Sequence, residues 1–71
     1  MVRRVLRPVP PNEGGTLGTV AFDAEAGTLE LSGLAVQALQ RDRERVGDDR
    51  AFGRMLIADG WSNGQLYLVT P

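Results

Sequence analysis

Apolar and polar residues alternate most clearly along residues 17–23 and 28–32, and this period of two predicts a pair of β-strands. The four residues between them, 24–27, end in glycine, which suits a hairpin loop whose last residue has a positive φ. We therefore expect a hairpin that buries one face and leaves the other polar. The buried face should hold Val20, Phe22, Leu29 and Leu31. The opposite face should hold Thr19, Ala21, Thr28 and Glu30, with Tyr67 as a further candidate, and should meet either solvent or another protein.

Two more segments have the composition of strands. The first, Val2 to Val9, is rich in valine, carries arginine on both faces and contains Pro8, with Pro10 just beyond it. Proline cannot donate a hydrogen bond to a neighbouring strand, so we expect this segment at the edge of the sheet. The last segment, Gln65 to Thr70, is apolar on both faces, which is typical of a central strand or of one covered on both sides.

A helical period follows the hairpin. It predicts a helix from Gly33 to about Val46, with Ser32 as the N-cap and Gly47 as a left-handed C-terminal stop. Arginines and acids alternate on its polar side. Each pair of opposite charges three residues apart stabilises the helix by a few tenths of a kcal/mol, at most about 0.5. The apolar side should hold Leu34, Ala35, Ala38, Leu39 and Val46.

A second, shorter helix should begin after Asp48 or Asp49, either of which can cap it, and should run to about Asp59. Gly53 weakens this helix by about 1 kcal/mol relative to alanine. An alternative interpretation makes residues 55–58 a strand that pairs with the last one. The inner stripe of the helix should hold Phe52, Met55 and Leu56.

The resulting order of elements, βββααβ, predicts an α+β fold. We expect one domain over residues 1–71, with a small antiparallel sheet of about four strands and two short helices packed on one of its faces. A chain of 71 residues buries only about 60% of its unfolded surface. Such a domain needs a well-packed core or a partner subunit, and self-association therefore stays open.

The composition of the chain excludes most kinds of side-chain catalysis. The chain has no lysine, histidine or cysteine, and all eight of its cationic side chains are arginine. It therefore lacks the usual acid/base group near neutral pH, a thiolate nucleophile or zinc ligand, and a Schiff-base amine. The hydroxyls of Ser32 and Ser62 have no base to activate them. We expect no catalytic, cofactor-binding or metal-binding residue, and hence no enzyme.

Carboxylates are the one remaining route to metal chemistry, because hard cations take oxygen ligands. Asp48, Asp49 and Asp59 are the acids that we weighed for such a site. Asp48 and Asp49 are adjacent and would diverge by about 100° on a helix. A helix cap beside a solvated acid is the simpler interpretation.

Charge is unevenly distributed in a chain whose formal net charge is −1. The first ten residues hold Arg3, Arg4, Arg7 and no acid, whereas the other 61 hold five arginines and nine acids, a net −4. Arginines on an edge strand bind phosphate or carboxylate groups well, and they also discourage aggregation of sheet edges. Trp61, in a glycine-flanked turn, is either a lid over the core or an exposed anchor.

Together these features predict a non-catalytic protein-protein interaction module: a small adaptor, assembly subunit or inhibitor that binds another protein or itself. Contact would use the arginine-bearing edge strand and the aromatic turn. The alternative is a nucleic-acid accessory protein that uses Arg3, Arg4 and Arg7 with Trp61 and Tyr67 as stacking surface. We expect no membrane partner, a cytoplasmic location and a GC-rich bacterial genome. The expected partner-binding residues are Arg3, Arg4, Val5, Arg7, Trp61, Asn63 and Tyr67.

Overall fold

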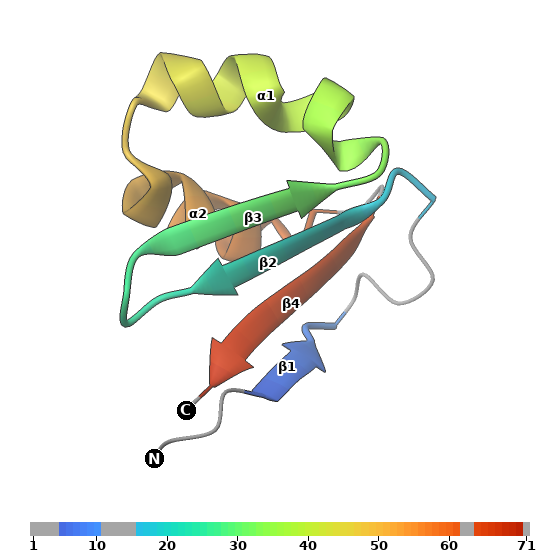
Figure 1. Cartoon of the computed structure of the whole chain (residues 1–71), viewed down its shortest axis with the longest axis vertical. Coiled ribbons are helices and arrows are strands. Elements are labelled where there is room, and N and C mark those ends of the chain that lie inside the picture. Colours follow the sequence, from blue (N-terminus) through green and yellow to red (C-terminus); the bar gives the residue numbers. More distant parts are fainter. Residues whose placement is uncertain (1–4, 11–15, 62–63, 71) are drawn as a thin grey trace.

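The computed structural model describes residues 5–10, 16–61 and 64–70, which form a four-stranded sheet and two helices (Figure 1). The elements occur in the predicted order βββααβ, and the α+β class is confirmed. The strands are β1 (Val5–Pro8), β2 (Thr19–Asp23), β3 (Thr28–Ser32) and β4 (Gln65–Thr70), and the helices are α1 (Ala35–Val46) and α2 (Asp49–Asp59).

The sheet is mixed, so the prediction of a purely antiparallel sheet is wrong at one strand pair. Its order is β1-β4-β2-β3, and β2 pairs with β4 in parallel, with Val20 opposite Leu66. The pairs β1/β4 and β2/β3 are antiparallel. The two helices carry the chain out and back to the end of the sheet where β2 begins (Figure 1). β4 begins at the same end of the sheet as β2 and pairs with it, so the two strands run in the same direction.

Strand positions in the sheet otherwise agree with the sequence. β1 lies at an edge and β4 is central, between β1 and β2, with Leu66 fully buried. The hairpin also forms as predicted, with Gly27 at a φ of +74°. Asp23 holds its loop, because one carboxylate oxygen accepts hydrogen bonds from the amides of Glu25 and Ala26 at 3.1 and 3.0 Å.

The core lies between the sheet and the two helices. The hairpin contributes three of its four expected apolar side chains as buried residues, and the fourth, Leu31, is half-buried against them. Residues 55–58 are helical, which excludes the strand alternative. Met55 is 49% exposed, so its predicted place in the inner stripe of α2 is wrong. The predicted place of Leu34 and Ala38 on the buried side of α1 is also wrong, because both residues are exposed. The buried apolar residues are Val20, Phe22, Leu29, Ala35, Leu39, Phe52, Leu56, Trp61 and Leu66.

The junction between α1 and α2 has the ends that the sequence predicted, whereas the start of α1 differs from the prediction. Gly47 ends α1 in the left-handed region with a φ of 71°, and Asp48 caps α2 by accepting hydrogen bonds from the amides of Arg50 and Ala51. Ser32 does not cap α1, whose N-cap position is Leu34 with no side-chain hydrogen bond. Ser32 is still part of β3, where its hydroxyl is hydrogen-bonded to that of Thr19 on β2.

Gly53 lets α2 approach the sheet closely. A Cβ placed on Gly53 would lie 2.2 Å from two ring atoms of Phe22, a fully buried residue of β2. Real Cβ atoms do not come this close to an aromatic ring, so only glycine fits here without a shift of the helix or the ring. The glycine that weakens α2 as an isolated helix is thus required by the packing of α2 on the sheet.

We expect Gly53→Ala to lower the free energy of unfolding by about 1–3 kcal/mol, because overpacking outweighs the gain of about 1 kcal/mol in helix propensity. Urea unfolding followed by circular dichroism measures the change. The matched control is Ala58→Gly, at an exposed position of the same helix. It should lose only about 1 kcal/mol from reduced propensity. A Gly53→Ala variant as stable as the natural chain would contradict the close contact with Phe22.

Candidate functional site

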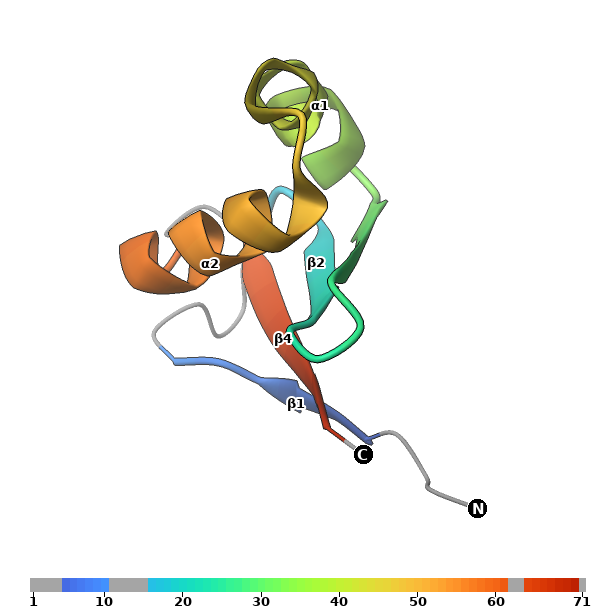
Figure 2. The ribbon, with the colours of Figure 1, turned by 90° about the vertical axis from the view of Figure 1, so that its left-hand side faces the viewer.

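Within the part of the chain that the structure describes, one face of the sheet carries no helix. Both helices lie on the other side or along the edge of β3, so the uncovered face is turned to the viewer in Figure 1 and to the right in Figure 2. We call this surface the open face. Side chains from all four strands reach it, because residues paired across neighbouring strands project to the same side. The open face is formed by Leu6, Pro8, Thr19, Ala21, Asp23, Thr28, Glu30, Ser32, Gln65, Tyr67 and Val69.

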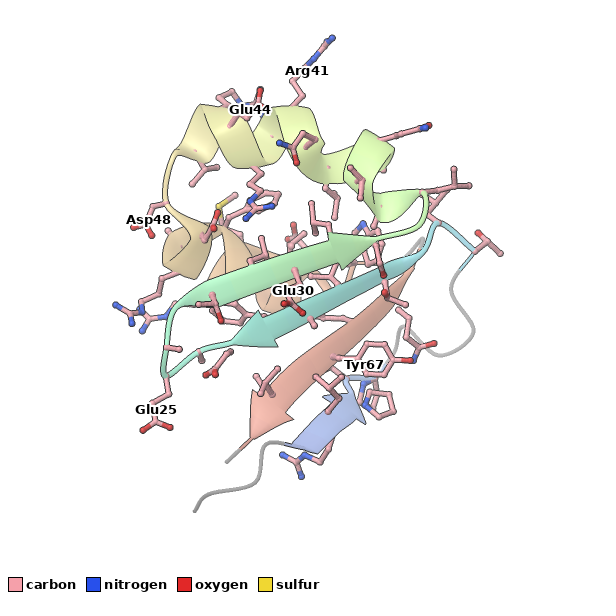
Figure 3. The ribbon with its side chains drawn as sticks, viewed as in Figure 1. Glu25, Glu30, Arg41, Glu44, Asp48 and Tyr67 are labelled. Atoms are coloured by element: carbon pink, nitrogen blue, oxygen red, sulfur yellow. The ribbon has the colours of Figure 1, made fainter. Side chains whose placement is uncertain are left out.

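Two shallow hollows lie on the open face. The larger, of about 500 Å³, is lined by Leu6, Ala21, Glu30 and Tyr67 among others. The second, of about 310 Å³, shares the first three of these residues and adds Val69. Leu6 is 56% exposed, and Figure 3 shows Glu30 and Tyr67 projecting from β3 and β4 on this same side. The open face therefore combines exposed apolar groups with one exposed acid and one phenol.

The charge of the open face is negative in the part of the chain that the structure describes. No arginine lines either hollow there, and Glu30 forms no ion pair with any described residue. Asp23 also borders the smaller hollow, but it is buried and its carboxylate is engaged in the hairpin loop. Glu30 is thus the acid on this face that stays exposed to a partner.

The outer edge of β3 is shielded. Helix α1 runs along it (Figure 1), and Arg43 of α1 donates a hydrogen bond of 3.3 Å to the backbone carbonyl of Leu29. A strand that is covered by a helix and capped by a side chain offers little to a pairing strand.

The outer edge of β1 is also poor in donors. Val9 follows Pro8, the last residue of β1, which pairs with Tyr67. The Val9 amide donates a hydrogen bond of 2.7 Å to the Leu66 carbonyl of β4. Hydrogen-bonded residues alternate along an antiparallel strand, so the backbone groups of Leu6 and Pro8 point away from β4. Proline has no N–H, which leaves Leu6 as the one outward donor within β1.

The structure describes only part of the group that the sequence predicted as a partner-binding surface. Arg3, Arg4 and Asn63 lie outside the described residues, and Val5 is described only by its backbone pairing with Thr70.

Arg7 is exposed on β1 but pairs with Leu68, whose side chain packs against the core. It therefore projects to the helix side of the sheet, whereas Tyr67 projects to the open face. Between them the two residues do not make one arginine–aromatic surface.

Trp61 belongs to the core. Its side chain is only 8% exposed, and its ring lies against Gly64, where an added Cβ would be 1.9 Å from the ring. Its backbone φ of 23° is unusual for a residue with a side chain. Of the two interpretations of this residue, the core lid is the one observed.

Leu6 and Pro8 are residues of the open face that the sequence analysis did not place there. The sequence did place Ala21, Glu30 and Tyr67 together, and the strand register confirms that they share a face. Leu6 alternates with Arg7, and this signal was present in the sequence. In the sequence pattern Arg4 shares the face of Leu6 and Arg3 the other face, so both faces looked charged and the signal was obscured.

Two of the three acids weighed as metal ligands have structural partners. Asp48 caps α2, and Asp49 accepts two hydrogen bonds of 2.9 Å from the guanidinium of Arg43. The same guanidinium also contacts the Leu29 carbonyl, so it joins α1, α2 and β3. Among the described residues, no three carboxylates lie close enough together to hold a metal ion.

No protein-family model, no curated protein and no solved structure matches this chain. In the ranges that the structure describes, neither helix has the length and apolar character needed to cross a membrane. The function must therefore be argued from the surface itself.

The Arg43–Asp49 pair should make stability depend on acid pH. Hydrogen bonds from Arg43 hold the pKa of the Asp49 carboxyl below its ordinary value, and the nearby positive charge acts in the same direction. Since the folded-state pKa is lowered, the pair stabilises the fold above the unfolded pKa of about 3.9. That contribution disappears as the pH falls through the lower, folded-state value.

We expect Asp49→Asn to lower the free energy of unfolding by up to about 1 kcal/mol near neutral pH, because the pair is partly exposed. Urea titrations from about pH 7 down to about pH 2 should show the difference from the natural chain shrinking to zero. Asp42→Asn breaks the more exposed pair with Arg45 and should change stability by less than about 0.5 kcal/mol. A difference that persists undiminished at the acid end would show that the ion pair is not its cause.

Proposed function

We propose that the protein is a non-catalytic protein-binding module and that the open face is its contact surface. The observation that carries this proposal is a sheet face that no helix of the described residues covers, on which Leu6 is more than half exposed beside two hollows. Exposed apolar groups gathered on one surface and rimmed by polar groups are typical of protein-protein contacts. An adaptor, an assembly subunit and an inhibitor would each act through such a surface.

The alternative of nucleic-acid binding is less well supported by this arrangement. It needs arginines and aromatic rings on one surface, so that phosphates and bases are contacted together. Trp61 is buried, and Arg7 and Tyr67 project to opposite sides of the sheet. The described part of the open face carries an exposed acid, Glu30, which would repel phosphates.

Side-chain chemistry also favours binding over catalysis. The chain has no lysine, histidine or cysteine, and two of the acids weighed for metal binding are engaged in a helix cap and an ion pair. A chain without cysteine is compatible with a reducing compartment, and we propose a cytoplasmic location on that ground.

We expect Leu6→Glu to abolish the recovery of protein partners. The experiment expresses the tagged full chain in its own host, cross-links it and quantifies the co-purified proteins by mass spectrometry. A carboxylate buried in an apolar contact would be desolvated without a partner, so partner recovery should fall at least about tenfold.

The matched control is Leu34→Glu. Leu34 is 52% exposed, close to the 56% of Leu6, but it lies at the start of α1, away from the open face. It should keep the partners that Leu6→Glu loses. Equal recovery by both variants, or loss in the control alone, would refute the open face as the contact surface. Thermal unfolding of both variants shows that each is folded.

A further inference from the structure

A slot lies on the open face between the side chains of Glu30 and Tyr67. Both residues pair with Ala21 of β2, Glu30 from β3 and Tyr67 from β4. Their backbones are two strand spacings apart, about 10 Å, with the methyl group of Ala21 between them. All three residues line the hollow of about 500 Å³, and Figure 3 shows Glu30 and Tyr67 on this side of the sheet. The slot has a carboxylate on one wall, an aromatic ring on the other and a small apolar floor.

The charge of the slot selects a cation. Glu30 is exposed, and its carboxylate forms no ion pair within the ranges that the structure describes. The described residues that line this hollow include no arginine, and Arg7 of β1 projects to the helix side. A positive group that enters the slot therefore meets an uncommitted carboxylate, whereas a phosphate or a carboxylate would be repelled.

An arginine side chain suits this slot better than a lysine does. The guanidinium group is planar, so its edge can donate two parallel hydrogen bonds to a carboxylate while its flat face lies on an aromatic ring. A cation over a tyrosine ring is also attracted by the negative face of the ring. Both contacts are made at once where the carboxylate and the ring flank a small residue, as Glu30 and Tyr67 flank Ala21.

An apolar patch lies next to the slot along the strands. Val69 follows Tyr67 by two residues on β4, so it lies about 7 Å further along the same face. Leu6 of β1 pairs with Val69, is 56% exposed and also lines the hollow of the slot. Side chains two residues apart in an extended segment have the same spacing of about 7 Å and project to one side. A segment with an arginine in the slot thus places a second side chain over this patch.

From this complementarity we infer that the open face binds an extended segment of a protein partner, with an arginine in the slot and an apolar side chain two residues away on Leu6 and Val69. The inference rests on the protein-binding role proposed above and gives the chemistry of the partner. Exposed ion pairs and cation–aromatic contacts are each weak in water. One short segment alone should therefore bind with a Kd of about 1–10 mM.

The first test titrates the isotope-labelled full chain with the peptide acetyl-Leu-Thr-Arg-amide, up to about 50 mM, and follows its amide signals by NMR. The matched probe carries citrulline, which has nearly the same shape as arginine but no charge. The arginine peptide should shift the signals of Ala21, Glu30 and Tyr67 and bind at least about threefold more tightly than the citrulline peptide. Equal affinities, or shifts confined to the helices, would overturn the inference.

Variants of the two walls isolate the contact. Glu30→Gln should remove most of the difference between the two peptides. Glu25→Gln removes an exposed acid of the hairpin loop and should leave that difference unchanged. Tyr67→Leu should weaken the arginine peptide about twofold to fivefold, whereas Tyr67→Phe keeps the ring and should bind it like the natural chain. Thermal unfolding shows that each variant is folded. Equal losses in the two glutamate variants would assign binding to net charge and contradict the slot.

The host experiment separates this inference from the proposed function. Glu30→Gln should recover at least about threefold less of the partners that Leu6→Glu loses, and Glu25→Gln should keep them. If Glu30→Gln keeps these partners as well, the arginine contact is refuted and the open face remains a contact surface. If the peptide binds but neither Leu6→Glu nor Glu30→Gln loses a protein, the cation in the slot does not belong to a protein partner, and both ideas fail.

Discussion

The contact between the Phe22 ring and Gly53 determines how the rest of the molecule is arranged. Phe22 is fully buried on β2, one of the two central strands, and α2 can lie against it only where the helix has no side chain. This approach directs Phe52 and Leu56 of α2 into the core. α1 and α2 lie behind the sheet or along the edge of β3, and the described chain has no other helix that could cover the opposite face. The open face is a consequence of this packing.

Features set by a few neighbouring residues could be predicted from the sequence. Gly47 and Asp48 end one helix and begin the next because a left-handed glycine and a side-chain cap act within one turn. Ser32 shows the limit of such reasoning. It is a good cap by type, but its hydroxyl is held by Thr19, thirteen residues away, because β3 continues through it. A competing contact from another strand overrides a local preference.

The direction of β4 and the location of Trp61 depend on contacts between distant segments, and the sequence pattern does not encode them locally. β4 is parallel to β2 because it inserts beside that strand after both helices. The apolar character of β4 on both faces predicted its central position but not its partner. Likewise, a tryptophan between glycines is compatible with both burial and exposure, and the fit of its ring over Gly64 decides the matter. Alternation alone correctly grouped Ala21, Glu30 and Tyr67, because a strand's period fixes which residues share a face.

The two edges of the sheet explain why contact should involve side chains on its face. β3 is shielded by α1 and by the hydrogen bond from Arg43, and β1 presents Pro8 where a pairing strand needs a donor. Backbone pairing is tolerant of sequence and would admit many strands, so blunted edges protect against aggregation. A face recognises its partner through shape and charge, and these differ between proteins. The combination of one shielded and one donor-poor edge with an uncovered, acidic and partly apolar face therefore favours a selective partner over strand addition.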